Sequence, residues 1–232
     1  MIRFDRASKR YPNGREALSS ASFEIRTGEM VYLTGRSGAG KSTVLKLIAL
    51  LERPSRGLVM VNGCNTAALA SRRIPAFRRE LGVVFQDHRL LPERSIFDNV
   101  ALPLHAAHSP LKEIDRRVRA ALDQVGLLDR AKSLPLELSV GEQQRVGIAR
   151  AVVGKPKLII ADEPTGNLDP ALSLEVMNLF RRFNDVGVTV VIATHDVEIV
   201  RASGLREIVI ADGKVQDPSA EGLDLPRVEA QR

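Results

Sequence analysis

One octapeptide limits what this chain can fold into more than any other feature of its sequence. Residues 35–42 read Gly-Arg-Ser-Gly-Ala-Gly-Lys-Ser, which matches the pattern G-x-x-x-x-G-K-[ST]. The apolar run Met30–Thr34 before it predicts a buried strand, and the residues Lys41–Leu51 after it predict a helix. A glycine-rich turn between a strand and a helix directs backbone N–H groups at phosphate oxygens. The sequence therefore predicts a phosphate-binding loop in an α/β domain.

The last two residues of the motif supply groups that the backbone does not have. Lys41 is predicted to reach the β- and γ-phosphates of a nucleotide, and Ser42 is predicted to hold Mg²⁺. The other candidate nucleotide-binding residues of this segment are Gly35, Arg36, Ser37, Gly38, Ala39, Gly40 and Thr43.

A second apolar run, Leu158–Ala161, ends in two carboxylates, Asp162 and Glu163. We predict that Asp162 holds the metal through its hydration shell. Glu163 should point in a different direction, where it orients or deprotonates a water molecule. The alternative is an acidic turn before Pro164, and the presence of Lys41 in the same chain weighs against it.

The order of the apolar runs indicates a parallel sheet. Leu158–Ala161 and Thr189–Ala193 show no polar alternation, as is typical of strands covered on both faces. Apolar positions at helical spacing over 172–183 lie between them, which favours strand–helix–strand units. The pairs Asn62-Gly63 and Asp212-Gly213 favour tight hairpins and suggest an antiparallel flank beside the parallel core.

The middle of the chain has a different character, because the strand signals fade from about Leu90 to Val153. We therefore predict a P-loop α/β core made of 1–86 and 154–216, interrupted by a helical insertion over 87–153. The remaining residues, 217–232, form a polar tail without periodicity.

Composition excludes several other classes. The formal net charge is +6 and the aromatic content is 4% with no tryptophan, so we expect no nucleic-acid partner. The only cysteine, Cys64, excludes an internal disulfide and a multi-cysteine zinc site. The best apolar run, Leu45–Leu51, is far shorter than the roughly 20 residues of a membrane span. Met1–Asp5 lacks the start of a secretory signal, so we expect a soluble cytoplasmic protein.

Further motifs carry a resemblance to a known family. Residues 138–145 read Leu-Ser-Val-Gly-Glu-Gln-Gln-Arg, which resembles the signature sequence of ATP-binding-cassette (ABC) ATPases. The family's other motifs are matched in the expected order by Tyr11 as the aromatic that stacks on adenine, Gln86 as the Q-loop glutamine, Asn167–Asp169 as the D-loop and His195 as the switch histidine. The resemblance covers residues 1–216 and implies a P-loop ABC nucleotide-binding domain that uses ATP and Mg²⁺.

The resemblance also implies roles and partners. Glu163, His195, Gln86 and Lys41 become the catalytic residues, and Gln86 joins Ser42 and Asp162 at the metal. Two copies are expected to pack head to tail when ATP binds. Nucleotide contacts from the second copy are then expected from Ser139, Gly141 and Asp169. Val140 departs from the pattern, because the family usually has glycine there.

Four stretches, 85–91, 146–153, 165–169 and 183–190, are similar to the FtsE family of bacterial cell-division ATPases. This finer resemblance implies a membrane protein of the FtsX type as partner, on the cytoplasmic side of the inner membrane at the division site. ATPases of lipoprotein-release or macrolide-export transporters share the catalytic residues and stay open as an alternative. A soluble P-loop protein, either a small-molecule kinase or a DNA-repair ATPase, is the third alternative. The signature at 138–141 weighs against a kinase, and the short insertion, without a long coiled coil, weighs against a chromosome-structure ATPase.

Overall fold

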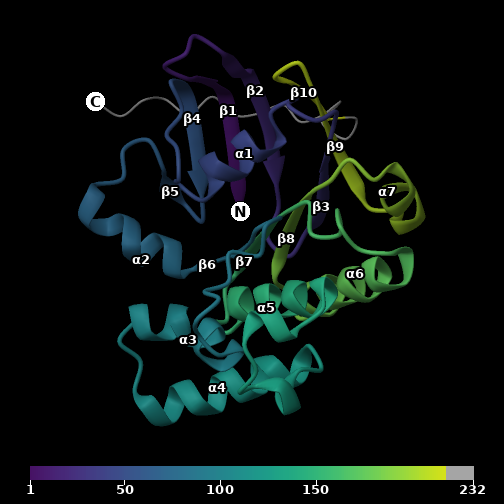
Figure 1. The fold of residues 1–232 in the computed structure, drawn as a ribbon. Coiled ribbons are helices and arrows are strands. Elements are labelled where there is room, and N and C mark those ends of the chain that lie inside the picture. The colour runs from purple at the N-terminus through teal and green to yellow at the C-terminus, as the bar shows by residue number, and fades with distance from the viewer. Residues whose placement is uncertain (218–232) are drawn as a thin grey trace.

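The computed structural model describes residues 1–217, which form two β-sheets with helices around them (Figure 1). The strands are β1 (Ile2–Arg10), β2 (Glu16–Ile25), β3 (Met30–Thr34), β4 (Arg56–Val61), β5 (Cys64–Asn65), β6 (Leu81–Val84), β7 (Leu158–Asp162), β8 (Thr189–Ala193), β9 (Arg206–Ala211) and β10 (Lys214–Gln216). The α-helices are α1 (Lys41–Ile48), α2 (Ile74–Arg79), α3 (Ile96–Ala106), α4 (Leu111–Gln124), α5 (Val140–Val152), α6 (Pro170–Asp185) and α7 (Val197–Ser203). Short 3₁₀ helices cover Ser71–Arg73, Leu128–Arg130 and Pro135–Glu137.

The larger sheet has the strand order β10-β9-β3-β8-β7-β6. Strand β3 pairs in parallel with β8 and β9, β7 pairs in parallel with β6 and β8, and only the edge strand β10 is antiparallel. The α/β fold with a parallel core is therefore confirmed. The carboxyl ends of β3, β7 and β8 meet at one edge, where the candidate site lies.

Side chains that alternate along the central strands divide between two hydrophobic cores. Tyr32 of β3 and Ile159 of β7 face one core, whereas their neighbours Val31 and Ile160 face the other. Both cores are fully apolar in these strands. This explains why the strands read as continuous apolar runs in the sequence.

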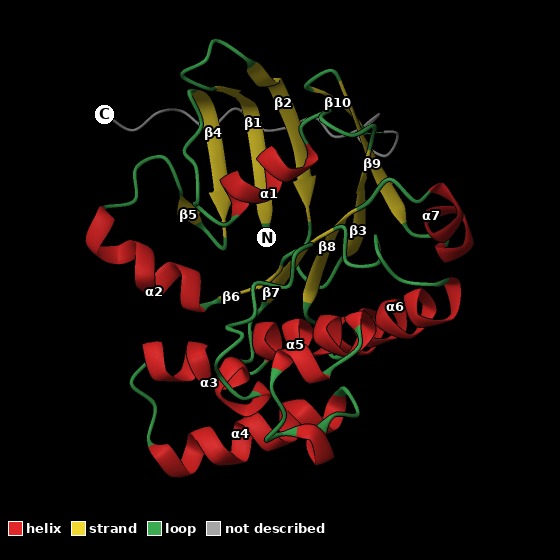
Figure 2. Ribbon diagram, viewed as in Figure 1, coloured by secondary structure: helices red, strands yellow, loops and turns green. Residues whose placement is uncertain are grey.

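The smaller sheet is antiparallel, with the order β2-β1-β4-β5, and α1 packs between it and the larger sheet (Figure 2). The predicted antiparallel flank is therefore present. The turn at Asn62-Gly63 has φ values of 51° and 76°, as the predicted hairpin requires, and it joins β4 to β5. The Asp212-Gly213 turn joins β9 to β10 and so extends the larger sheet instead of the flank.

Helices α3, α4 and α5 lie together on the opposite side of the larger sheet from α1 (Figure 2). The apolar stripe of α4 is buried, with Ile114, Val118, Ala121 and Leu122 all facing the core. These helices share one hydrophobic cluster with the sheet. The division into a core and a separate insertion over 87–153 therefore stays a prediction.

One segment boundary differs from the sequence prediction, and another lies outside the described residues. Helix α1 ends at Ile48 instead of Leu51, because Leu50 takes a left-handed φ of 52°. The predicted tail lies outside the described residues except for Asp217, which forms an ion pair with Arg206 at 2.5 Å. Within residues 1–217, no helix has the length and apolar character needed to cross a membrane.

Candidate active site

The loop between β3 and α1 has a backbone that only glycine can adopt at two positions. Gly35 and Gly40 have φ values of 140° and 122°. A Cβ atom on Gly35 would lie 2.1 Å from the carbonyl oxygen of Ile210, and one on Gly40 would lie 2.5 Å from that of Ala17. Any side chain would therefore push the loop away from β9 and β2.

Lys41 begins α1 and points back into this loop. Its side chain is only 7% exposed, and its Nζ atom donates a hydrogen bond of 2.7 Å to the carbonyl oxygen of Gly35. The same Nζ lies 3.4 Å from Oε1 of Glu163. The ammonium is thereby held over the loop, where phosphate oxygens are predicted to bind.

Glu163 stands between a cation and an imidazole. Its Oε2 atom lies 2.9 Å from Nδ1 of His195, which follows β8, and 3.3 Å from the backbone nitrogen of His195. Glu163 itself has a left-handed φ of 46°, although the next residue is Pro164, which disfavours that region. The strained backbone aims this carboxylate into the cavity beside Lys41, as expected from its place one residue after Asp162.

Asp162 points elsewhere and has the features of a metal-binding carboxylate. Burial raises its pKa above the usual range, a hydrogen bond from Ser42 lowers it, and the charge of Glu163 raises it further. Within residues 1–217, the Oδ1 atom of Asp162 is buried and has no hydrogen-bond partner. A buried carboxylate oxygen with a free lone pair, next to a serine hydroxyl, fits the oxygen ligands that Mg²⁺ prefers.

A cavity of about 850 Å³ opens over the loop. Tyr11 and Gln86 lie at its wall, together with Glu163 and His195. The hydroxyl of Tyr11 lies 3.4 Å from Oγ1 of Thr43. The other sequence-predicted residues that line the cavity are Gly35, Arg36, Ser37, Gly38, Gly40, Lys41, Ser42 and Thr43.

Ala39 contributes differently from the rest of the loop. Its carbonyl oxygen accepts a hydrogen bond of 3.1 Å from the nitrogen of Gly213, and its side chain packs on the core that contains α1. It thereby ties the loop to the β9–β10 turn.

The remaining candidates form a second group at the N-termini of α5 and α6. Ser139 caps α5: its Oγ atom accepts from the nitrogen of Glu142 at 3.3 Å and donates to the Glu142 carboxylate at 2.9 Å. A Cβ atom on Gly141 would lie 3.0 Å from Leu172, so the start of α5 packs closely on α6. Asp169 caps α6 by accepting from the nitrogens of residues 171 and 172. Ser139, Gly141 and Asp169 do not line the 850 Å³ cavity.

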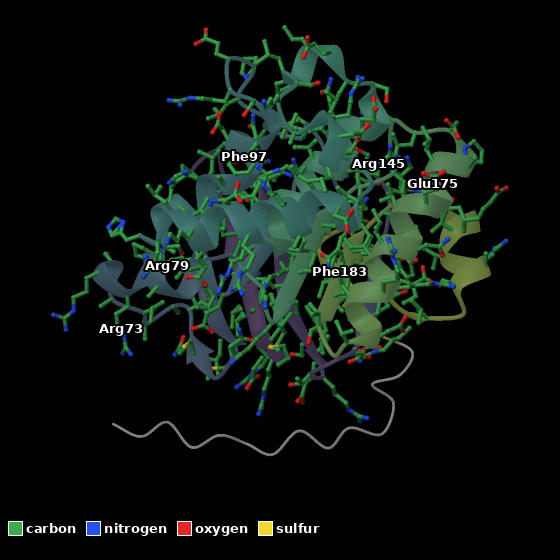
Figure 3. The ribbon with its side chains drawn as sticks, turned by 90° about the horizontal axis from the view of Figure 1, so that it is seen from below. Arg73, Arg79, Phe97, Arg145, Glu175 and Phe183 are labelled. Atoms are coloured by element: carbon green, nitrogen blue, oxygen red, sulfur yellow. The ribbon has the colours of Figure 1, made fainter. Side chains whose placement is uncertain are left out.

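An ion pair ties these two helices together further along. Arg145 of α5 lies 3.2 Å from Glu175 of α6, and Figure 3 shows the two side chains next to each other on the helical side of the molecule. The two helices that carry the second group are therefore linked both by packing at their N-termini and by this ion pair.

The cavity residues that escaped the sequence analysis include Arg15 and Glu207. Arg15 donates a hydrogen bond of 2.7 Å from Nη2 to the carbonyl oxygen of Gly38. Glu207 of β9 accepts one of 2.5 Å from Oγ1 of Thr34. Both contacts join segments that are far apart in sequence, and neither residue belongs to a recognisable motif. The only signal was the closeness of Arg15 to Tyr11 along the chain.

Comparisons with known proteins agree with this geometry. The family model described as "ABC transporter" matches residues 18–166. The chain therefore belongs to the ABC family of ATP-binding proteins, and its fold and relatives define it as an ABC-type ATPase.

Its relatives narrow the class further. The chain is 54% identical over 213 residues to the cell division ATP-binding protein FtsE of Escherichia coli K12, a match that covers 92% of this chain and 96% of that protein. It is 46% identical to the protein of the same name from Bacillus subtilis, over 96% of this chain and 97% of that one.

Solved structures show the same fold. The dimeric structure of the cassette MJ0796 in a post-hydrolysis state, bound to ADP and Pi, superimposes with a TM-score of 0.86 at 36% identity, covering 93% of this chain and 97% of the other. The cbiO1 component of a Clostridium perfringens ABC transporter complex matches with a TM-score of 0.85 at 30% identity, covering 95% and 89%.

Proposed function

We infer that this chain is the ATP-hydrolysing subunit of a cell-division ABC complex of the FtsE type. The observation that carries the chemistry is the position of the Glu163 carboxylate, between Lys41 Nζ at 3.4 Å and His195 Nδ1 at 2.9 Å. The identity of 54% with a cell division ATP-binding protein over nearly its full length supports the biological role.

In the proposed reaction, Glu163 accepts the proton of the attacking water. A carboxylate with one oxygen turned to an ammonium and the other to an imidazole is held in one orientation, so it needs no reorganisation during the reaction. Lys41 neutralises charge on the β- and γ-phosphates, and His195 orients Glu163 and the γ-phosphate. Tyr11 stacks on the adenine at the other end of the cavity.

The proposed metal ligands are Ser42, Asp162 and Gln86. Mg²⁺ would supply Lewis-acid charge stabilisation at the β- and γ-phosphates. Two observations support this assignment: the Oδ1 atom of Asp162 has no partner among the described residues, and the same carboxylate has a hydrogen bond with Ser42. Gln86, two residues after β6, lines the 850 Å³ cavity together with Ser42.

The second group of residues is proposed to act on the ATP of another copy. Ser139, Gly141 and Asp169 stand at helix N-termini, where backbone N–H groups favour anions. Two copies packed head to tail would each close the other's cavity, and hydrolysis would remove the bridging charge and let them part. The solved dimers of MJ0796 at 36% identity support this arrangement.

A groove of about 640 Å³ between α2, α3 and α5 is the proposed dock for the membrane partner. Its floor is apolar, with Leu81, Val83 and Leu104. Its described lining residues include four arginines, Arg78, Arg79, Arg117 and Arg150, and no carboxylate. Arg79 projects from the edge of the helical side in Figure 3. We therefore expect a short cytoplasmic helix of an FtsX-like protein, with acidic residues flanking apolar ones.

This partner would hold the chain on the cytoplasmic side of the inner membrane at the division site, and no nucleic acid is expected to bind. The alternative, the ATPase of a lipoprotein-release or macrolide-export transporter, shares the catalytic residues. The cell-division names of the relatives favour the first role.

A single variant distinguishes assembly with the membrane partner from ATP hydrolysis. Asp162→Asn removes a metal ligand but lies away from the groove, so it should still co-purify with the membrane partner and reach the division site. Cells with this variant as their only copy should form filaments, most clearly in low-salt medium. Asp115→Asn, which breaks an exposed ion pair with Arg119 on α4, is the matched control and should divide normally. Normal division by Asp162→Asn, with ATPase activity confirmed absent, would refute the role of hydrolysis in division.

A further inference from the structure

The turn after Gln86 is strained. His88 and Arg89 are consecutive residues with left-handed φ values of 55° and 48°. Neither is glycine, and for each such residue the left-handed region is unfavourable relative to the right-handed one. Within the described residues, the buried Nδ1 atom of His88 also lacks a hydrogen-bond partner. Other contacts must therefore hold the turn in this conformation.

One guanidinium supplies the strongest of those contacts. Arg150, near the C-terminal end of α5, donates from Nη1 to the carbonyl oxygen of Arg89 at 2.7 Å and from Nη2 to that of His88. The Arg89 side chain folds back over the Phe85 ring, with 4.1 Å from Cζ to the ring centroid, and bonds to Asp87. The planar fork of arginine matches two neighbouring carbonyl oxygens, which a lysine does less well.

The contact of Arg150 with the turn holds the turn in place but buries a cation. Burial lowers the pKa of Arg150, the Arg89 cation lowers it further, and Asp87 opposes both effects. A buried guanidinium such as that of Arg150 is retained when the turn needs its hydrogen bonds.

The same helix begins at the second group of candidate site residues. Ser139 and Gly141 lie at the N-terminus of α5, Arg150 lies three turns further on, and Gln86 lines the ATP cavity just before the strained turn. A shift of Gln86 towards bound nucleotide can therefore pull on α5 through two hydrogen bonds, and a shift of α5 can move Gln86.

We propose that Arg150 is a positioning residue that holds the His88–Arg89 turn in its left-handed conformation and so fixes Gln86 relative to the N-terminus of α5. This inference rests on the proposed ATPase function. Without the two hydrogen bonds from the Arg150 guanidinium the turn relaxes. Gln86 then no longer reaches the metal and the γ-phosphate in the geometry that hydrolysis needs. The pocket around Lys41 is untouched, so nucleotide still binds.

The test compares Arg150→Met with wild type in the full-length chain. We expect the Kd for ATP without Mg²⁺ to stay within about twofold, kcat to fall roughly tenfold, and the Mg²⁺ concentration for half-maximal rate to rise roughly fivefold, effects of the size expected for one or two lost charge-assisted hydrogen bonds. Arg182→Met is the matched control, because Arg182 also donates to a carbonyl oxygen on another helix, that of Gln124 at 3.2 Å. It should leave all three values unchanged.

A rescue distinguishes positioning from general stability. Glycine adopts a left-handed φ without strain, so His88→Gly in the Arg150→Met background should recover most of kcat and of the Mg²⁺ response. If Arg150→Met does not accumulate as folded protein, Arg150→Lys takes its place. It should show a loss of about threefold, the effect of keeping one of the two bonds, with the same rescue.

Two results would overturn the proposal: wild-type kcat and Mg²⁺ response in the Arg150 variant, or a loss that His88→Gly does not restore. Failure of the wild-type chain to hydrolyse ATP would instead refute the proposed function.

Discussion

The ATP cavity and the N-terminus of α5 differ in the origin of the contacts that hold their polar groups. In the cavity, Lys41 comes from α1, Glu163 from the end of β7 and His195 from the segment after β8, yet Glu163 contacts both of the other side chains. At α5, Ser139 is bound to Glu142 within a single helical turn, and the adjoining Val140 is 48% exposed. The first arrangement needs the whole fold, whereas the second needs only local sequence.

This difference indicates which steps each region can perform by itself. The cavity is organised for nucleotide within one chain, because its charged groups already hold one another in place. The α5 terminus has satisfied side chains and an exposed first turn, so in the proposed head-to-tail arrangement its ligand is the ATP of a second copy. Changes in the cavity should therefore alter ATP binding or chemistry in a monomer, whereas changes at α5 should alter only the dimer.

The largest expected effect belongs to Lys41. Lys41→Ala removes the buried cation over the loop and breaks its ion pair with Glu163. ATP affinity should fall roughly 100-fold or more, the factor for two lost bonds to a charged group at about 1.5 kcal/mol each. Isothermal titration measures it, with the exposed Lys112→Ala as control. A Kd within threefold of wild type would remove Lys41 from the phosphate site.

Glu163→Gln should separate binding from chemistry. The amide keeps the shape of the carboxylate but accepts no proton, so kcat should fall on the order of 100-fold or more while the Kd for ATP changes little. ATP should then accumulate a dimer, visible by light scattering after size exclusion. Glu113→Gln, which breaks a surface pair with Arg117, should hydrolyse normally. A Glu163 variant that keeps half of the wild-type rate would place the proton acceptor elsewhere.

Tyr11 tests the other end of the cavity. Stacking on an aromatic ring is worth about 1–3 kcal/mol, so Tyr11→Ala should raise the KM for ATP about tenfold with little change in kcat. Tyr11→Phe keeps the ring and loses only the contact of its hydroxyl with Thr43, so its KM should stay near wild type. A large loss of kcat at constant KM would argue against adenine stacking.

Val140 tests the α5 side of the comparison. A β-branched residue stands at the first position of the helix with its side chain partly exposed. In the Glu163→Gln background, Val140→Gly should lower the ATP concentration for half-maximal dimer formation about threefold, by removing bulk where a second copy would close. Its monomer should bind ATP as before. An altered monomer Kd would show that the two regions are not independent.

The sequence predicted best the elements whose surroundings are uniform. Met30–Thr34 and Thr189–Ala193 are apolar on both faces, so their pattern survives whatever packs on them. Strands β1 and β2 were missed for the opposite reason. Their pairing register shifts between Phe4 and Ala7, and Arg6 and Ser20 take left-handed φ values, so the alternation of buried and exposed residues breaks.

The residues of the candidate site also divide into those that the sequence predicted and those that it did not. The loop 35–42 was predictable because its glycines and Lys41 act through the local backbone. The left-handed conformation of Glu163 was not, since a residue before proline prefers extended backbone and only long-range contacts impose the alternative. Arg15 and Glu207 were missed because their contacts join distant segments.

The smallest expected effect measures what the buried carboxylate of Asp162, beside Ser42, costs in folding free energy. Burial raises the pKa of Asp162, so its pKa in the folded chain lies above that in the unfolded chain, and stability falls as the pH rises through the folded value. Asp162→Asn removes this buried charge, and without nucleotide its Tm at pH 8 should rise by roughly 2–4 °C, the shift for about 1 kcal/mol in a chain of this size. The gain should shrink as the pH is lowered towards 5, where more of the wild-type carboxylate is protonated. Asp115→Asn, at an exposed ion pair, should show neither effect. A lower Tm for Asp162→Asn at pH 8, or a gain independent of pH, would mean that burying the Asp162 carboxylate costs no folding free energy. That carboxylate would then be as well satisfied as the cap of α5.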